Sequence, residues 1–229
     1  MMNLRRLSVA LVAVFGLAAV SSAQISADLT AASHYAWRGM DVLGGAKLPI
    51  QPSVTYSHES GLSANVWGSF GLLDRDNGVD QSDEIDFTVD YSGAVNEQIG
   101  YSVGSIVYYL PSADGADPTL EFYGGVSAAV IGSPSFTYYY DTSLLDDGDA
   151  MYFSLAGGHS IPVADYSLDL GAALGYNPDT SYDLGITAGV PVELGSITLT
   201  PFGSFTYAAD DVNPDNTIIF GGITASYAF

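Results

Sequence analysis

Strict alternation of side-chain character over the last thirteen residues, 217–229, is the feature that most limits how this chain can fold. One set is apolar or aromatic apart from Gly221: Ile219, Gly221, Ile223, Ala225, Tyr227 and Phe229. The interleaved set is mostly small or polar: Ile218, Phe220, Gly222, Thr224, Ser226 and Ala228. Because successive side chains of a strand point to opposite faces, this pattern predicts a strand with one face suited to lipid. It indicates the last strand of a transmembrane β-barrel.

Period-two stretches recur along the whole chain and number twelve, at about 26–38, 48–58, 62–71, 83–93, 98–110, 119–131, 134–142, 150–161, 163–177, 180–192, 195–208 and 217–229. Their connections are alternately long and short, with 178–179 as a short exception. An even strand number, short periplasmic turns and long outer loops are typical of bacterial outer-membrane barrels. The predicted fold class is therefore all-β, a transmembrane antiparallel up-and-down β-barrel of about 12 strands. The alternative is a soluble β-sandwich or secreted barrel with its apolar face inside, which would need neither the aromatic ending nor the loop rhythm.

The N-terminus has the pattern of an export signal. Arg5 and Arg6 precede the apolar stretch 7–20, and the small residues 21–23 suit cleavage before Gln24. We expect a signal peptide over 1–23 and an outer-membrane β-barrel over 24–229, with a retained anchor as the alternative. The aromatic end at Phe229 resembles the signal by which such barrels reach the insertion machinery of a Gram-negative outer membrane.

The predicted mature chain is strongly acidic. Of the five Lys and Arg residues only Arg38, Lys47 and Arg75 follow residue 23, whereas all 26 Asp and Glu do, so its net charge is 3 − 26 = −23. This charge argues against nucleic acid as a partner, because phosphate binding needs the opposite sign. It favours cations or lipopolysaccharide bridged by divalent ions as partners, beside outer-membrane lipid. General adaptation to a salty habitat explains the charge equally well.

The polar faces of the predicted strands would line a lumen. The predicted pore-lining residues are Arg38, Asp86, Asp90, Glu121, Asp169 and Asp183. Parity places Arg38 on the face of Asp28, Thr30 and His34, as the only base within a predicted strand. It would either set the field of an open pore or close the lumen through a buried Arg–Asp pair. Convergence of five large side chains in the middle would indicate a plugged barrel: Arg38, Trp67, Tyr108, Tyr123 and Phe202.

No catalytic constellation is recognisable, so we expect neither an enzyme nor a cofactor. The three histidines lie on separate strands, and His159 and Ser160, being adjacent, would face opposite sides. Acidic loops offer weak candidate sites for divalent ions at Asp74, Asp76, Asp80, Asp146, Asp147 and Asp149. They lack the terminal Glu and the helices of an EF-hand.

A local motif resembles a known family. Tyr35, Trp37, Arg38 and Gly39 are followed, after a Pro-containing aromatic strand, by Trp67, Gly68 and Ser69. This order resembles the TorF-type outer-membrane porins over about residues 26–92, and is only architectural beyond them. The resemblance implies an outer-membrane barrel with a pore, without naming a solute.

The predicted function is thus that of a porin-like channel for passive passage of small solutes, with a preference for cations. The alternative is a non-transporting structural or surface-interaction barrel whose acidic extracellular loops bind divalent ions. Twelve strands lie between eight, which enclose packed side chains, and sixteen, which leave an aqueous channel.

Overall fold

The computed structural model describes residues 23–74, 82–113, 117–142, 151–178, 181–209 and 217–229. Twelve strands in these residues form the barrel: β1 (Ala23–Ala32), β4 (Pro49–His58), β5 (Leu62–Gly71), β6 (Glu84–Ala94), β7 (Ile99–Tyr109), β8 (Thr119–Ala128), β9 (Ser135–Asp141), β10 (Met151–Val163), β11 (Tyr166–Asn177), β12 (Ser181–Gly189), β14 (Ile197–Ala208) and β15 (Thr217–Ala228). Three short strands accompany them: β2 (Ala36–Trp37), β3 (Met40–Asp41) and β13 (Val192–Leu194). Within the same ranges, no helix is long and apolar enough to cross a membrane.

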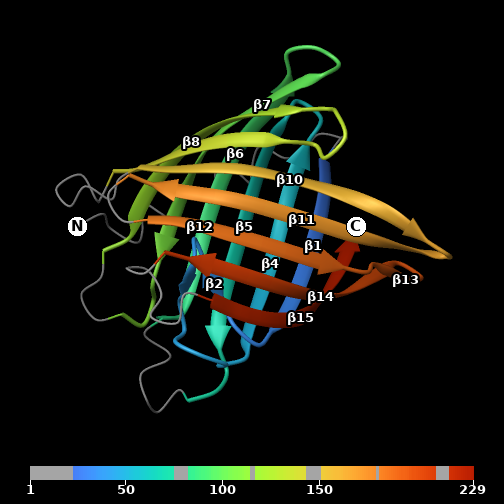
Figure 1. Ribbon diagram of the computed structural model, residues 1–229. Coiled ribbons are helices and arrows are strands. Elements are labelled where there is room, and N and C mark those ends of the chain that lie inside the picture. Colours follow the sequence, from blue (N-terminus) through green and yellow to red (C-terminus); the bar gives the residue numbers. More distant parts are fainter. Residues whose placement is uncertain (1–22, 75–81, 114–116, 143–150, 179–180, 210–216) are drawn as a thin grey trace.

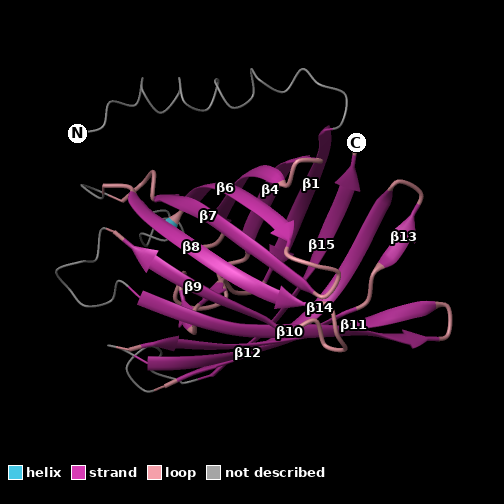
Figure 2. Ribbon diagram, turned by 90° about the horizontal axis from the view of Figure 1, so that it is seen from above, coloured by secondary structure: helices cyan, strands magenta, loops and turns pink. Residues whose placement is uncertain are grey.

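The barrel closes through consecutive antiparallel pairs. Each barrel strand pairs with the next along the chain, β12 pairs with β14, and β15 returns to β1 with Leu29 opposite Ala225. Figures 1 and 2 show the strands wrapping around a central space, with the β10–β11 hairpin extending past its neighbours at the end that carries the C-terminus. Closure removes every strand edge along the shared height of the wall, which suits a lipid environment. The fold class predicted from the sequence is confirmed.

The two faces of the wall follow the predicted alternation. Large apolar side chains point outward and are substantially exposed, among them Val89, Val103, Leu155, Leu174, Ile186 and Ile219. Their neighbours in sequence point into the lumen, where Thr30 shares a hydrogen bond with Thr224 across β1 and β15. Phe229 faces outward beside Tyr227, with ring centroids 4.7 Å apart. An apolar exterior around a polar interior is the reverse of a soluble barrel.

One predicted strand is wrong at its end. The stretch 26–38 forms a strand only as far as Ala32, and Arg38 does not share the face of Asp28 and Thr30. The chain turns inward after Ser33, whose backbone N–H donates to the carbonyl of Gly221 at 2.9 Å. The connection expected to form an outer loop over 39–47 therefore begins inside the barrel.

The two prolines within predicted strands occupy interruptions of the ladder. Pro52 pairs with Leu29 of β1, whereas the β4–β5 pairing skips positions 51 and 52. Pro201 lies where the partner of β14 changes from β12 to β13. Both therefore sit where the missing N–H removes no bond from a continuous ladder.

Close packing inside the wall gives a first testable prediction, on Gly104 of β7. A Cβ there would lie 2.5 Å from the ring of Tyr123 and 2.6 Å from the carbonyl oxygen of Val89. Gly104→Ala should lower the free energy of unfolding by about 1–3 kcal/mol, because the Tyr123 ring must shift. Urea unfolding in lipid vesicles measures the loss. Gly185→Ala is the matched control, since nothing lies within 4 Å of its Cβ position, and an equal loss in both variants would contradict the steric explanation.

Candidate functional site

A short hairpin lies inside the barrel at the end where the long loops connect the strands. Strands β2 and β3 pair Ala36 with Asp41 and Trp37 with Met40, which leaves Arg38 and Gly39 as a two-residue turn. Both turn residues have positive φ, 47° and 83°, as a type I′ turn requires. We call residues 34–47 the inner hairpin.

The tip of the inner hairpin rests on the wall formed by β12 and β14. A Cβ at Gly39 would lie 2.6 Å from Cβ of Ala208 and 3.0 Å from Cβ of Asp183. Ala208 is fully buried there. Glycine is thus needed at position 39 twice, for its positive φ and for this close approach.

The side chain of Arg38 points from the tip to β8, β9 and β10. Its Nη2 donates to both carboxylate oxygens of Glu121, at 2.9 and 2.7 Å. Its guanidinium carbon lies 4.4 Å from the ring centroid of Trp37, 4.8 Å from that of Tyr139 and 4.2 Å from that of Tyr152. We call Glu121, Trp37, Tyr139 and Tyr152 the guanidinium cage.

Hydrogen bonds from other wall residues hold the guanidinium cage in place. The Tyr108 hydroxyl donates to Glu121 at 2.8 Å, and the Tyr152 hydroxyl donates to Asp183 at 2.8 Å. The Glu121 side chain is 2% exposed and that of Arg38 is 18% exposed. A buried charge pair is stable only with such additional hydrogen bonds. The cage is therefore preorganised by wall residues.

The stem of the inner hairpin packs on the opposite wall. Tyr35 donates its hydroxyl to Glu84 at 2.9 Å, and its ring lies 5.4 Å from that of Trp67. Trp37 meets Tyr108 edge to face at 6.0 Å, and Leu43 is buried with Tyr35. Between its tip and its stem, the inner hairpin touches β5 to β10, β12 and β14.

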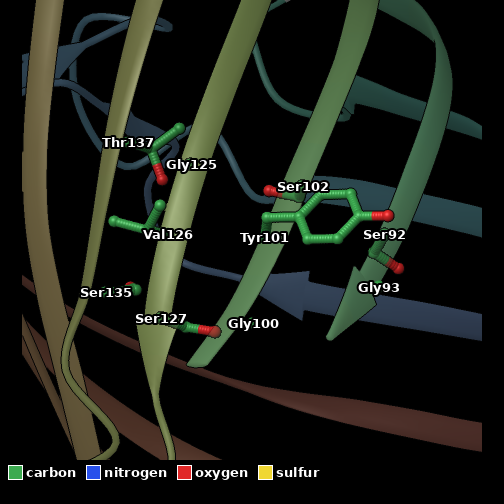
Figure 3. Close-up of a pocket in the computed structure, with 10 residues that line it drawn as sticks. All are labelled: Ser92, Gly93, Gly100, Tyr101, Ser102, Gly125, Val126, Ser127, Ser135 and Thr137. Atoms are coloured by element: carbon green, nitrogen blue, oxygen red, sulfur yellow. The ribbon is translucent and has the colours of Figure 1, made fainter. Parts of the chain in front are cut away.

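Open space remains on both sides of the inner hairpin. A vestibule of about 1020 Å³ at the long-loop end is lined by Tyr35, Trp37, Asp41, Glu84, Tyr108 and Asp141, among others. Lower on the wall, a hollow of about 350 Å³ is lined by small and hydroxyl-bearing residues of β6 to β9, including Ser92, Ser102, Ser127 and Thr137 (Figure 3). The hairpin therefore narrows one half of the lumen, and the other half has polar walls.

The structure brings some of the predicted pore-lining residues together. Arg38 and Glu121 form the ion pair, and Asp183 lies under the hairpin tip. Asp86 pairs with Tyr108 in the ladder and keeps one buried oxygen without a partner. Two others stand apart from the hairpin: Asp90 accepts from Tyr123 at 2.7 Å, and Asp169 accepts from Ser160 at 2.5 Å.

Of the five side chains whose convergence would indicate a plug, four gather around the inner hairpin. Trp67 contacts Tyr35 of the hairpin. The ring of Tyr123 packs on that of Tyr139, with centroids 5.6 Å apart. Phe202 instead packs on Phe220, at 6.4 Å on β14 and β15. The aromatic residues thus fill one sector of the lumen, at the height of the hairpin.

The residues of the sequence motif divide between hairpin and wall. Tyr35, Trp37, Arg38 and Gly39 build the inner hairpin, and Trp67 packs against Tyr35. Ser69 is fully buried and accepts from Gln51 at 3.3 Å. Gly68 lies in β5 opposite Ile85. The motif residues therefore build the inner hairpin and part of the wall on which it packs.

Most residues of the candidate divalent-ion sites lie outside the described part of the chain. Asp76, Asp80, Asp146, Asp147 and Asp149 lie outside the described residues, and Asp74 forms an ion pair with Lys47. In the ranges that the structure does describe, no three His, Asp or Glu residues are placed to hold a metal ion. His159 and Ser160 take opposite faces, since Ser160 binds the inward Asp169.

Sequence reasoning missed the role of several residues. Tyr139 and Tyr152 point inward from β9 and β10, but nothing in the sequence pattern distinguishes them from tyrosines that face the lipid. Glu84, the seat of Tyr35, falls at the start of a strand beside the loop. Gly39 was the one available signal, because a two-residue type I′ hairpin turn favours glycine at its second position.

Comparisons with known proteins place the fold. The KdgM porin superposes with a TM-score of 0.56 at 11% identity, over 89% of this chain and 99% of that chain. An outer-membrane channel from Pseudomonas putida F1 gives 0.52 at 10% identity, over 93% and 97%. The NanC porin gives 0.51 at 10% identity, over 89% and 98%. At identities this low, the structural similarity shows a shared barrel fold and nothing more.

A comparison with curated proteins finds no significant match. Residues 17–190, about three quarters of the chain, match a family described as "Bacterial protein of unknown function (Gcw_chp)". The structural comparison thus supports the porin fold that the resemblance to TorF-type porins implied. The family that the match establishes has a different name. The chain belongs to the Gcw_chp family.

Proposed function

We propose that the protein is an outer-membrane channel through which small solutes pass passively, with a preference for cations. Its location in the membrane is supported by the apolar exterior of a closed barrel and by the porin fold. Passage is supported by the polar lumen face and by the space on both sides of the inner hairpin.

The observation that carries the proposal is the charge of the lumen face. Carboxylates reach it from five strands: Asp28, Glu84, Asp86, Asp90, Glu121, Asp169 and Asp183. Within the described residues, Arg38 is the one strong base inside the barrel, and Glu121 pairs with it. Lumen carboxylates that have no basic partner attract cations and repel anions.

The inner hairpin would set the size limit. It carries Tyr35, Trp37 and Arg38 across the long-loop half of the lumen, where they meet aromatic wall residues. A solute must pass between the hairpin and the remaining wall, which favours small solutes. A first loop folded inward thus acts as the constriction.

The charge also separates this chain from a structural neighbour. One structure of the KdgM porin is described as a complex with oligogalacturonate, a polyanion. A lumen rich in carboxylates repels a polyanion. We therefore expect oligogalacturonate neither to pass through this barrel nor to reduce its ion current.

Planar-bilayer recording of the refolded mature protein tests the proposal. In a potassium chloride gradient we expect discrete conductance steps. The sign of the reversal potential should show that potassium passes more readily than chloride. Asp28→Asn with Asp169→Asn, two lumen positions away from the hairpin, should lessen that selectivity without changing the step frequency. Anion-selective reversal in the unaltered protein would refute the cation preference.

A second candidate function is a closed barrel with a structural or surface-interaction role. The gathering of Trp67, Tyr108 and Tyr123 around the hairpin favours it. In that case outer loops would bridge to lipopolysaccharide through divalent ions. Electrical silence from protein that is shown by heat-modifiable gel mobility to be folded would support this function over the channel.

A further inference from the structure

We propose that the guanidinium cage is a binding site for solutes that carry a guanidinium group, and that Arg38 occupies it as a built-in competitor. The inference rests on the proposed channel function and names a solute class for it. A solute that enters the cage would displace Arg38, and with it the tip of the inner hairpin.

The first argument is that the chain itself fills the site with a guanidinium. Three aromatic rings lie 4.2–4.8 Å from the Arg38 guanidinium carbon, and a carboxylate accepts from its nitrogen at 2.7 Å. Aromatic faces attract a cation within about 6 Å of the ring centroid, more strongly where water is excluded. The planar group can also stack on the rings, which a compact ammonium cannot do.

The second argument is that most of the cage belongs to the wall. Glu121, Tyr139 and Tyr152 lie on β8, β9 and β10, and Tyr108 and Asp183 hold two of them from β7 and β12. These hydrogen bonds do not involve the hairpin. The wall part of the site, made by Glu121, Tyr139 and Tyr152, therefore persists when Arg38 leaves it.

The third argument is that Arg38 is held by a connection and not by a strand of the wall. The inner hairpin has only two ladder pairs of its own, and its turn contacts the wall through Gly39. The vestibule of about 1020 Å³ is lined by Trp37 and Tyr108 and gives a solute access to this region. A ligand can shift the docked hairpin only by its preference for the vacated cage, which a second guanidinium has.

Emptying the cage by substitution gives the direct test. The Arg38→Ala protein, folded in detergent micelles, is titrated with methylguanidinium by calorimetry. We expect saturable binding, weakened about 10- to 100-fold when Glu121→Gln is added, because a charge-assisted hydrogen bond is lost. Ethylammonium, which cannot stack, should bind more weakly, and Lys47→Ala should create no site because Lys47 pairs with Asp74 at the rim. No saturable binding to folded Arg38→Ala protein would overturn the proposal.

A second measurement tests whether a guanidinium solute competes with Arg38 in the unaltered cage. The chain has no cysteine, so Leu43→Cys adds a single thiol at a hairpin position that is 6% exposed. Millimolar methylguanidinium should accelerate its reaction with a thiol reagent several-fold, whereas equal potassium chloride should not. Ala36→Cys serves if Leu43→Cys does not fold. An unchanged rate in both variants would overturn the competition, since the solute would then fail to reach the cage.

These readouts separate the site from the channel. Calorimetry and labelling need no current, so positive results in both with silence in bilayers would retain the site and reject the channel. Conversely, cation-selective steps that methylguanidinium leaves unchanged, without binding to Arg38→Ala, would retain the channel and reject the site.

Discussion

Replacing residues 34–47 with a short Gly-Asn turn should raise the single-channel conductance several-fold. The inner hairpin carries Tyr35, Trp37 and Arg38 into the lumen, and removal of these side chains would widen the part that we propose as the constriction. The replacement is geometrically simple, because Ala31 and Ile50 are already cross-strand partners in β1 and β4. Planar-bilayer recording in symmetric potassium chloride measures the change.

The control for this deletion must alter a connection without touching the lumen. Replacing the turn between β4 and β5, at 59–61, tests whether any loop change alters the current, because it lies at the opposite end of β4 from the inner hairpin. Its conductance should equal that of the unaltered protein. If the deletion leaves conductance unchanged while the barrel folds, the constriction lies elsewhere and the role given to the hairpin is wrong.

The wall of the barrel could be predicted from sequence because its physical demands repeat in every strand. A lipid-facing position must be apolar and a lumen-facing one can be small or polar, so a period of two appears directly in the residues. Within 166–176, every second residue is apolar or aromatic, and Tyr166, Leu170, Leu174 and Tyr176 of this row are exposed on the outer face of β11. The ends of the strands were harder to predict, because residues beyond the membrane need not alternate between apolar and polar.

The inner hairpin could not be predicted by the same logic. Alternation continues from Ala32 through Trp37, so parity extends the strand although the chain has left the wall. The turn at Arg38 and Gly39 is favoured by glycine, but the close approach to Ala208 follows from the closed barrel and leaves no local pattern. Arg38 therefore lies in a turn of the inner hairpin, and the strand parity that predicted its position does not extend to it.

The partners of Arg38 were only partly predictable. Glu121 was among several inward carboxylates, with no local feature that singled it out. It lies 83 positions further along the chain, and a pairing at that separation depends on how far each strand is staggered against the next. Register of this kind is set by the whole barrel.

Glu121→Ala should lower the stability of the barrel and raise its conductance together. It leaves the Arg38 guanidinium and the Tyr108 hydroxyl without their shared carboxylate, in a place where Glu121 is 2% exposed. Breaking a buried ion pair from one side costs about 3–5 kcal/mol of unfolding free energy where the remaining charge cannot move. Arg38 can move, because it lies on a connection, so undocking of the inner hairpin limits the loss. We therefore expect a reduced loss of stability together with increased conductance.

Urea unfolding in vesicles and bilayer recording of the same variant separate these two effects. Lys47→Ala removes the other ion pair of the described residues, whose side chains are 21% and 52% exposed, and should cost about 0–1 kcal/mol without changing the current. Arg38→Ala with Glu121→Ala should cost less than the sum of the single changes, because each alone strands its partner. Strict additivity would mean that the two residues do not interact in the membrane. A stability loss without increased conductance would mean that the hairpin stays docked through Tyr35 and Gly39, and that the aromatic contacts, rather than the ion pair, hold the constriction.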